Sequence, residues 1–154
     1  MKIFLDANLL IYLNTIGEKQ NPDLEKFYSD LLEEDLYTDV LILDETLYIS
    51  MSKYHVPYQL SFEFLKMNIL PYSTVIPIDE SDVSSMEKYL SRYKIKPSDA
   101  IHLSAMEREG VANIASEDAE LDDVKEVKRI WFSKSEASTK EIDRKKNPKE
   151  PLEQ

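Results

Sequence analysis

Four acidic residues stand where an α/β protein gathers the groups of an active site. Asp6 and Asp118 each follow an apolar run that is typical of a buried strand. Asp99 falls in the first turn of one predicted helix, and Glu45 lies inside another. The carboxyl ends of parallel strands meet at one edge of a sheet, where ligands bind in open α/β folds. We therefore expect the four carboxylates to converge at that edge.

Such a cluster implies metal chemistry, because four carboxylates repel one another unless cations hold them together. The chain has no cysteine and only two histidines, which excludes thiolate zinc, iron–sulfur clusters and disulfides and makes a histidine-rich zinc site improbable. Oxygen ligands suit Mg²⁺ or Mn²⁺. An ion of this kind lowers the pKa of a bound water and stabilises the departing oxygen of a phosphodiester, so the expected chemistry is hydrolysis by metal-activated water.

Each acid also has a purely structural interpretation. Asp6 or Asn8 would cap a helix over residues 9–13. Asp99 would favour its helix through the dipole, by about 0.3 to 1 kcal/mol, and Asp118 would cap a short helix after it. Glu45 is harder to explain in this way, because it sits within an apolar run where an unpaired charge is costly to bury. The convergence of all four, rather than any one of them, favours a functional site.

Strands and helices alternate along the chain. The predicted strands cover residues 3–5, 36–38, 74–78, 111–116 and 127–132, and the predicted helices cover 9–13, 22–34, 39–51, 58–70, 79–93 and 97–106. A polar loop is expected over residues 14–20. This alternation predicts an α/β sandwich with a mainly parallel sheet and right-handed crossovers.

The periodicity also predicts which side chains enter the core. The helix over residues 39–51 is apolar nearly all round, so we expect it to be buried. Apolar residues at helical spacing are expected to form the inner faces of the two helices that follow: Leu60, Phe62, Phe64, Leu65, Met67 and Leu70, then Val83, Met86 and Leu90.

Length and composition are those of one folded domain over residues 1–132 with a charged, solvated tail over 133–154. No stretch approaches the roughly 20 apolar residues of a membrane span, so we expect a cytoplasmic protein. The net charge of -11 argues against a protein that coats nucleic acid. It does not argue against a nuclease, since metal ions offset the field of an acidic site.

Four segments resemble the signature blocks of the PIN domain family, in the family's order. They are Phe-Leu-Asp-Ala-Asn-Leu-Leu-Ile-Tyr-Leu from residue 4, Leu-Asp-Glu-Thr-Leu-Tyr from 43, Lys-Pro-Ser-Asp-Ala-Ile-His from 96 and Ile-Ala-Ser-Glu-Asp from 114. The resemblance covers about residues 1–132. It implies a three-layer α/β/α sandwich and a Mg²⁺- or Mn²⁺-dependent endoribonuclease similar to the VapC toxins of prokaryotic toxin–antitoxin pairs. A homodimer, an RNA substrate and a small antitoxin are the partners it implies.

The family's acidic positions map onto four residues: Asp6, Glu45, Asp99 and Asp118. The leading hypothesis makes Asp6, Asp99 and Asp118 the ligands of one or two metal ions, while Glu45 orients or deprotonates the attacking water.

The remaining candidates support the acids or meet the substrate. Asn8 and Ser116 match the family's polar supporting positions. The family's last block usually continues with an acid and an aromatic residue, where this chain has Glu120 and Leu121, so Glu120 or Asp122 is an alternative outer ligand. The candidate substrate contacts are Arg92, Lys94, Lys96 and His102. For His102, a packing or surface role is the favoured alternative.

Two other functions compete with the nuclease. A PIN-like scaffold would keep the acids and serve as a binding module in an RNA-processing or regulatory complex, which the net acidity favours. A phosphatase with Asp6 as the nucleophile fits less well, because such enzymes usually carry a second Asp two residues later and this chain has Asn8.

Overall fold

The computed structural model describes residues 1–16 and 21–133. Within them, five strands form one sheet in the order β3-β2-β1-β4-β5, and every neighbouring pair is parallel. The strands are β1 (Lys2–Leu5), β2 (Asp35–Asp39), β3 (Ser73–Ile76), β4 (Asn113–Ala115) and β5 (Lys128–Ile130). The predicted parallel α/β architecture is confirmed.

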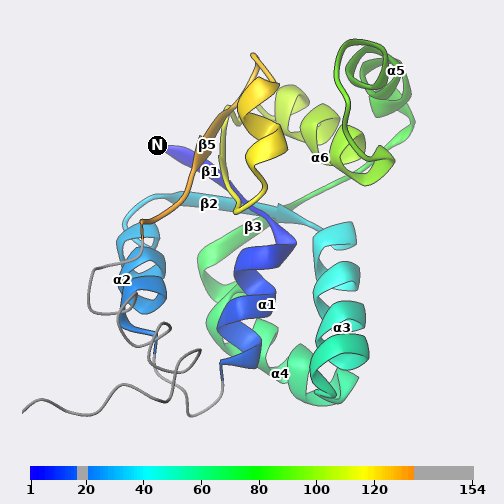
Figure 1. Cartoon of the computed structure of the whole chain (residues 1–154). Helices are drawn as coiled ribbons and strands as arrows, with labels where there is room; N and C mark the ends of the chain where they lie inside the picture. Colours follow the sequence, from blue (N-terminus) through cyan, green and yellow to red (C-terminus); the bar gives the residue numbers. More distant parts are fainter. Residues whose placement is uncertain (17–20, 134–154) are drawn as a thin grey trace, which may run out of the picture.

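Helices cover both faces of the sheet (Figure 1). On one face lie α1 (Ala7–Thr15), α2 (Pro22–Leu31), α3 (Val40–Tyr54) and α4 (Tyr58–Asn68), with the 3₁₀ turn η1 (Leu70–Tyr72) before β3. On the other lie α5 (Val83–Arg92), α6 (Pro97–Arg108) and η3 (Ala119–Asp123), and the short turn η2 (Glu80–Asp82) leads into α5. The result is the expected three-layer sandwich.

Local sequence explains where several helices begin and end. Asn21 accepts a hydrogen bond from the backbone N–H of Leu24 at the start of α2. Asp39 likewise accepts from the backbone N–H of Ile42 at the start of α3. Gly110 follows α6 with a φ of +69°, a left-handed conformation that glycine adopts without steric cost.

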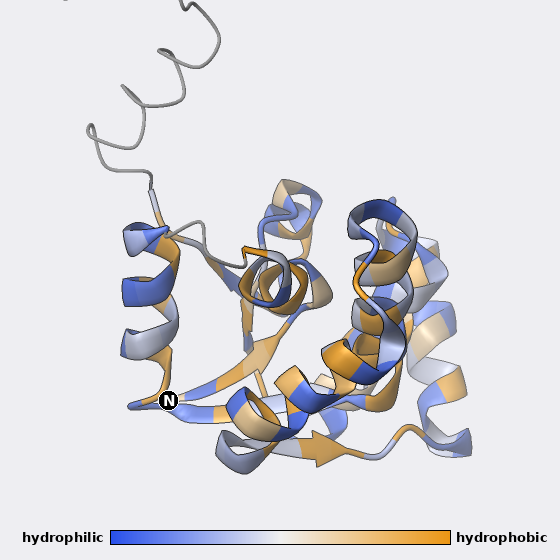
Figure 2. Cartoon of the chain, turned by 90° about the horizontal axis from the view of Figure 1, so that it is seen from below, coloured by the Kyte–Doolittle hydropathy of each residue, from blue (hydrophilic) through white to orange (hydrophobic). Residues whose placement is uncertain are grey.

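The core lies between the sheet and the helices. Strand β1 is central in the sheet, and its residues Ile3, Phe4 and Leu5 are almost completely buried. Figure 2 shows hydrophobic residues along the strands and along the inner sides of the helices. A buried β1 is important for the site because it fixes the position of the residue that follows it, Asp6.

The prediction that the helix after β2 is buried is wrong. Val40 and Tyr48 on α3 are 61% and 60% exposed, and Glu45 is exposed as well. Other predicted core residues also lie on the surface: Leu60, Phe62 and Met67 of α4, and Val83 and Leu90 of α5. An apolar pattern shows that a face is hydrophobic but not that the same chain covers it.

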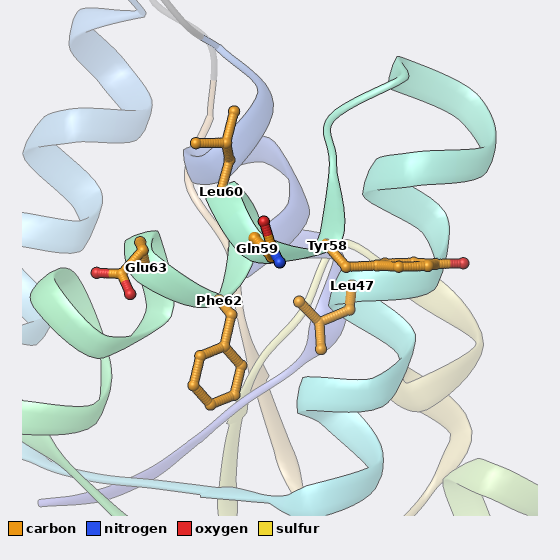
Figure 3. A pocket seen from close by; sticks show the side chains of 6 residues that line it. All are labelled: Leu47, Tyr58, Gln59, Leu60, Phe62 and Glu63. Atoms are coloured by element: carbon orange, nitrogen blue, oxygen red, sulfur yellow. The ribbon is translucent and has the colours of Figure 1, made fainter.

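One half-buried residue of α3 and the first turns of α4 line a groove of about 690 Å³ (Figure 3). Its lining residues are Leu47, Tyr58, Gln59, Leu60, Phe62 and Glu63.

Two further predictions concern segments outside the elements. The predicted loop over residues 14–20 is wrong at its start, because α1 continues to Thr15, while residues 17–20 lie outside the described residues. Asn14 donates hydrogen bonds to the hydroxyls of Ser50 (3.0 Å) and Ser61 (2.8 Å). The tail was predicted over residues 133–154, and all of it from residue 134 onward lies outside the described residues. None of the helices in residues 1–16 and 21–133 is long and apolar enough to cross a membrane.

Candidate acidic site

Asp6 caps the helix that follows β1 and also accepts a hydrogen bond from the end of β4. Its side chain caps α1, since Oδ1 accepts a hydrogen bond from the backbone N–H of Ala7 at 2.8 Å. Its other oxygen, Oδ2, accepts from the Ser116 hydroxyl at 2.5 Å. The carboxylate is 8% exposed. Asp6 rather than Asn8 is therefore the helix cap, and the cap also faces the end of β4.

Ser116 is the centre of a hydrogen-bonded cluster at the ends of β1 and β4. Its hydroxyl accepts from the Asn8 side chain at 3.2 Å and from the backbone N–H of Asp118 at 3.1 Å, while it donates to Asp6. The Asn8 oxygen accepts from the backbone N–H of Glu117. These bonds place Asn8 and Ser116 directly beside the two strand-end acids.

Asp118 caps η3, as the sequence suggested. Its Oδ1 accepts from the backbone N–H of Glu120 at 3.0 Å. Capping does not remove the residue from the acidic site, because the Asp118 charge acts on Asp99 and contributes to raising the pKa of that carboxyl.

Glu45 reaches the site from the opposite direction, on α3. Although the residue is exposed, partial desolvation of its carboxyl raises the pKa, and the nearby Asp6 charge raises it further. His102 and Lys96 act in the opposite direction. Ionisation of Glu45 is therefore less favourable than that of a free carboxyl. The residue lies at the surface, however, and not in the buried environment that the sequence suggested.

Asp99 is the most perturbed of the four acids. Burial, followed by the charge of Asp6, raises its pKa to about 6, and Asp118 adds to the effect. Within the described residues, neither Asp99 nor Glu45 has a hydrogen bond or ion pair. The charge of Asp6 therefore acts on both Glu45 and Asp99, and the charge of Asp118 acts on Asp99.

The four carboxylates are suitable ligands for a hard divalent cation, although they are not arranged around a common point. In residues 1–16 and 21–133, no group of three or more acidic or histidine side chains is arranged to hold a metal ion. The chemistry of the set is nevertheless suitable: the groups are carboxylates, and mutual repulsion contributes to the raised pKa of two of them. A cation would remove that repulsion.

The two alternative outer ligands differ in their surroundings. Asp122 forms a bidentate ion pair with Arg129, at 2.8 and 2.9 Å, and this bonding lowers the pKa of Asp122. Asp122 is thus already neutralised, which makes it a poor metal ligand. Glu120 is exposed on η3, next to the Asp118 cap.

The four predicted substrate contacts differ in their exposure and in their neighbours. Lys96 precedes α6 and lowers the pKa of both Glu45 and Asp99 through its charge. Lys94 is exposed. Arg92 is exposed and pairs with Glu126 at 3.5 Å. A substrate contact by His102 is contradicted, because the side chain is 2% exposed.

Sequence reasoning missed two sets of contacts near the acids. His102 Nδ1 lies 2.5 Å from Oδ2 of Asp39, and both side chains are buried. Arg129 donates to the carbonyl of Ser116 at 3.1 Å, next to its Asp122 pair. The sequence signals were weak: Asp39 suggested only a helix cap, and nothing local linked Arg129 to Ser116, the residue after β4.

The fold and the acids at the strand ends define the class of protein. The model of the PIN domain family matches residues 3–127, and the chain belongs to this family. A comparison with curated protein sequences finds no match.

Solved structures with a similar fold include toxins of toxin–antitoxin systems. The chain is similar to Mycobacterium tuberculosis VapC20, a sarcin–ricin loop cleaving toxin, with a TM-score of 0.64 and 13% identity, covering 80% of this chain and 95% of that one. It is also similar to VapBC2 from Rickettsia felis bound to a promoter DNA fragment. The TM-score is 0.67 and the identity 14%, and the match covers 86% of this chain and 100% of that one. A third similar structure is FitAcB from Neisseria gonorrhoeae, with a TM-score of 0.61 and 18% identity. This match covers 83% of this chain and 96% of that one. At these identities the likeness shows the fold.

Proposed function

We propose that this protein is a divalent-metal-dependent endoribonuclease that hydrolyses RNA phosphodiester bonds, using Mg²⁺ or Mn²⁺. The observation that carries the proposal is the electrostatic coupling of the four acids. Asp6 acts on the pKa of both Glu45 and Asp99, and Asp118 acts on the pKa of Asp99. Glu45 and Asp99, whose pKa values are raised in part by neighbouring acids, suit a bound cation.

The residues take distinct roles in this proposal. Asp6, Asp99 and Asp118 hold one or two ions, which when bound supply a Lewis acid and an activated water. Glu45 orients the attacking water or takes its proton, a role that suits a carboxyl with a raised pKa. Asn8 and Ser116 keep the strand-end acids in place through their hydrogen bonds. Lys96 is the best-placed cation for a substrate phosphate, while Glu120 remains a candidate outer ligand.

The test is RNA cleavage by the Asp6→Asn variant in Mn²⁺. Asn has the same shape and still caps a helix, so the variant should fold. Cleavage of varied RNAs by the unmodified protein, abolished in Asp6→Asn and by EDTA, is the expected result. Undiminished cleavage by a folded Asp6→Asn variant would sink the assignment.

A binding or scaffold module is the second candidate. It is favoured by one observation: among the described residues, no three acidic or histidine side chains are arranged to hold an ion. Under this alternative, the protein binds its partner and leaves RNA intact in saturating Mn²⁺. The cleavage assay above therefore also separates the two candidates.

We further propose that the physiological partner is a small antitoxin encoded next to this protein. Proteins similar in fold are toxins in complexes of this kind. The apolar groove between α3 and α4 is the proposed docking surface (Figure 3). Co-expression with the product of the adjacent reading frame should give a complex, and Phe62→Glu should weaken it. A complex unaffected by this change would exclude the groove.

The protein alone is proposed to be a homodimer, which light scattering on the purified chain would test. A dimer that Phe62→Glu dissociates would show that a second copy, rather than an antitoxin, covers the groove. A monomer would contradict the dimer while leaving the nuclease proposal unaffected.

A further inference from the structure

The acids of the site are carried by helices on opposite faces of the sheet. Glu45 lies on α3 and Asp99 on α6 (Figure 1). Helix α3 packs mainly on α1 and α4, whereas α6 packs mainly on α5. Neither helix packs mainly on the other, so a contact that joins their N-terminal ends bears directly on the separation of Glu45 and Asp99.

One buried carboxylate makes that connection. Asp39 is the last residue of β2 and caps α3. Its Oδ1 accepts a hydrogen bond from the backbone N–H of Ile42 at 3.0 Å. Its Oδ2 lies 2.5 Å from Nδ1 of His102 on α6. Within the described residues, this is the only side-chain hydrogen bond between the cap of α3 and α6. Asp39 thus joins a strand end and two helices.

The pair lies directly beneath the acidic site. His102 follows Asp99 by three residues and so shares its helix face. Asp6 and Asp99 both act electrostatically on His102, and the ring of Phe4 packs beside it with centroids 5.6 Å apart. Asp39 and His102 are 0% and 2% exposed.

Stability alone gives little reason for this arrangement. Apolar residues of similar volume are often as stabilising as a buried ion pair, or more so. The pair also leaves His102 Nε2 buried without a hydrogen-bond partner among the described residues, which is itself unfavourable. Its better-attested use is to fix the relative position of the elements that carry it.

We propose that Asp39 and His102 form a positioning pair that sets the separation of Glu45 and Asp99 across the sheet edge. Neither residue touches substrate or metal. The inference rests on the proposed function, because Asp99 is a proposed ligand of the divalent ion and its displacement would weaken binding of that ion.

Three variants distinguish the effect of losing the Asp39–His102 hydrogen bond from the effect of substituting either residue. His102→Leu removes the bond and replaces the ring with an apolar side chain. His102→Asn keeps an N–H donor close to the position of Nδ1. Asp39→Ser keeps a helix cap but is too short to reach His102. A matched control is Asp82→Asn, which weakens another pair that joins a buried carboxylate to α6: Asp82 of η2 is 2% exposed and accepts from Arg108 of α6 at 3.0 Å.

The first readout is Mn²⁺ affinity, measured by calorimetry on the full chain. We expect His102→Leu and Asp39→Ser to bind Mn²⁺ about tenfold more weakly, the lower end of what loss of an outer supporting contact costs. His102→Asn should stay within about threefold of the unmodified protein. Asp82→Asn should lower the melting temperature and leave Mn²⁺ affinity unchanged. Equal affinity in His102→Leu and the unmodified protein would overturn the inference, as would an equal loss in Asp82→Asn.

A second readout needs no metal. Amide hydrogen exchange in the first turns of α3 and α6 should accelerate in His102→Leu and Asp39→Ser but not in His102→Asn. Unchanged exchange in both helices would contradict the positioning role. If the unmodified protein binds no Mn²⁺, the proposed function fails, and exchange still decides whether the pair ties the helices together.

Discussion

The two halves of the acidic site are held in different ways. In the bonded half, Asp6 and Asp118 accept hydrogen bonds from backbone N–H groups, and Ser116 links them. In the unbonded half, Glu45 and Asp99 have no hydrogen bond or ion pair within the described residues. Burial and the neighbouring acids raise the pKa of both. The fold thus holds the first half through its own hydrogen bonds, whereas the second half has no such bonds among the described residues, and under the proposed function a cation would complete it.

The largest expected effect comes from removing a charge of the unbonded half. Asp99→Asn should reduce RNA cleavage about 10³-fold, because losing a metal ligand costs several kcal/mol of transition-state stabilisation. The measurement is kcat/KM in saturating Mn²⁺. A loss below tenfold would show that Asp99 is not a ligand and that the unbonded half is not part of the site.

A smaller effect is expected when the bonded half loses its central hydroxyl. Ser116→Ala removes the hydrogen bond to Asp6 and the acceptor of two others, so Mn²⁺ affinity should fall about 10- to 100-fold. Ser104→Ala is the control, since Ser104 is also buried but donates only within α6, to the carbonyl of Ala100. Equal affinity in the two variants would remove the distinction between the halves.

The halves should also differ in how pH affects stability without metal. The pKa of Asp99 is raised from 3.8 to about 6, so its ionisation opposes folding. That penalty is fully present above pH 6 and vanishes below pH 3.8. In EDTA, Asp99→Asn should therefore melt at a higher temperature than the unmodified protein at pH 8, and the difference should disappear towards pH 3.5. A lower melting temperature at pH 8 would contradict the repulsion.

The smallest effect concerns the cation beside the unbonded half. Lys96→Gln should raise KM for RNA a few-fold and reduce the slope of log KM against log salt concentration by about 0.7, the value of one phosphate contact on a single strand. Lys66, which pairs with Glu63 on α4, provides the control, as Lys66→Gln should leave the slope unchanged. Identical slopes in both variants would exclude Lys96 as a phosphate contact.

The bonded half was the more predictable part of the site from sequence. An apolar run that ends in an acid marks a strand end, so Asp6 and Asp118 were placed by local pattern alone. The parallel sheet followed from the alternation of elements, and the helix caps at Asn21 and Asp39 from residue type.

What could not be predicted depends on contacts between distant segments. Asp39 and His102 are 63 residues apart, and nothing in either local pattern indicates that they meet. The exposure of Leu60 and Val83 was missed for a related reason, since periodicity identifies an apolar face without showing whether this chain covers it.

The central claim is that a divalent ion completes the site, and anomalous diffraction from a Mn²⁺-soaked crystal tests it most directly. The account predicts a manganese peak bounded by carboxylate oxygens of Asp6 and Asp99, with Asp118 in the same coordination sphere and Glu45 at its margin. A crystal in which manganese is absent from these four carboxylates, at a concentration that supports cleavage in solution, would contradict it.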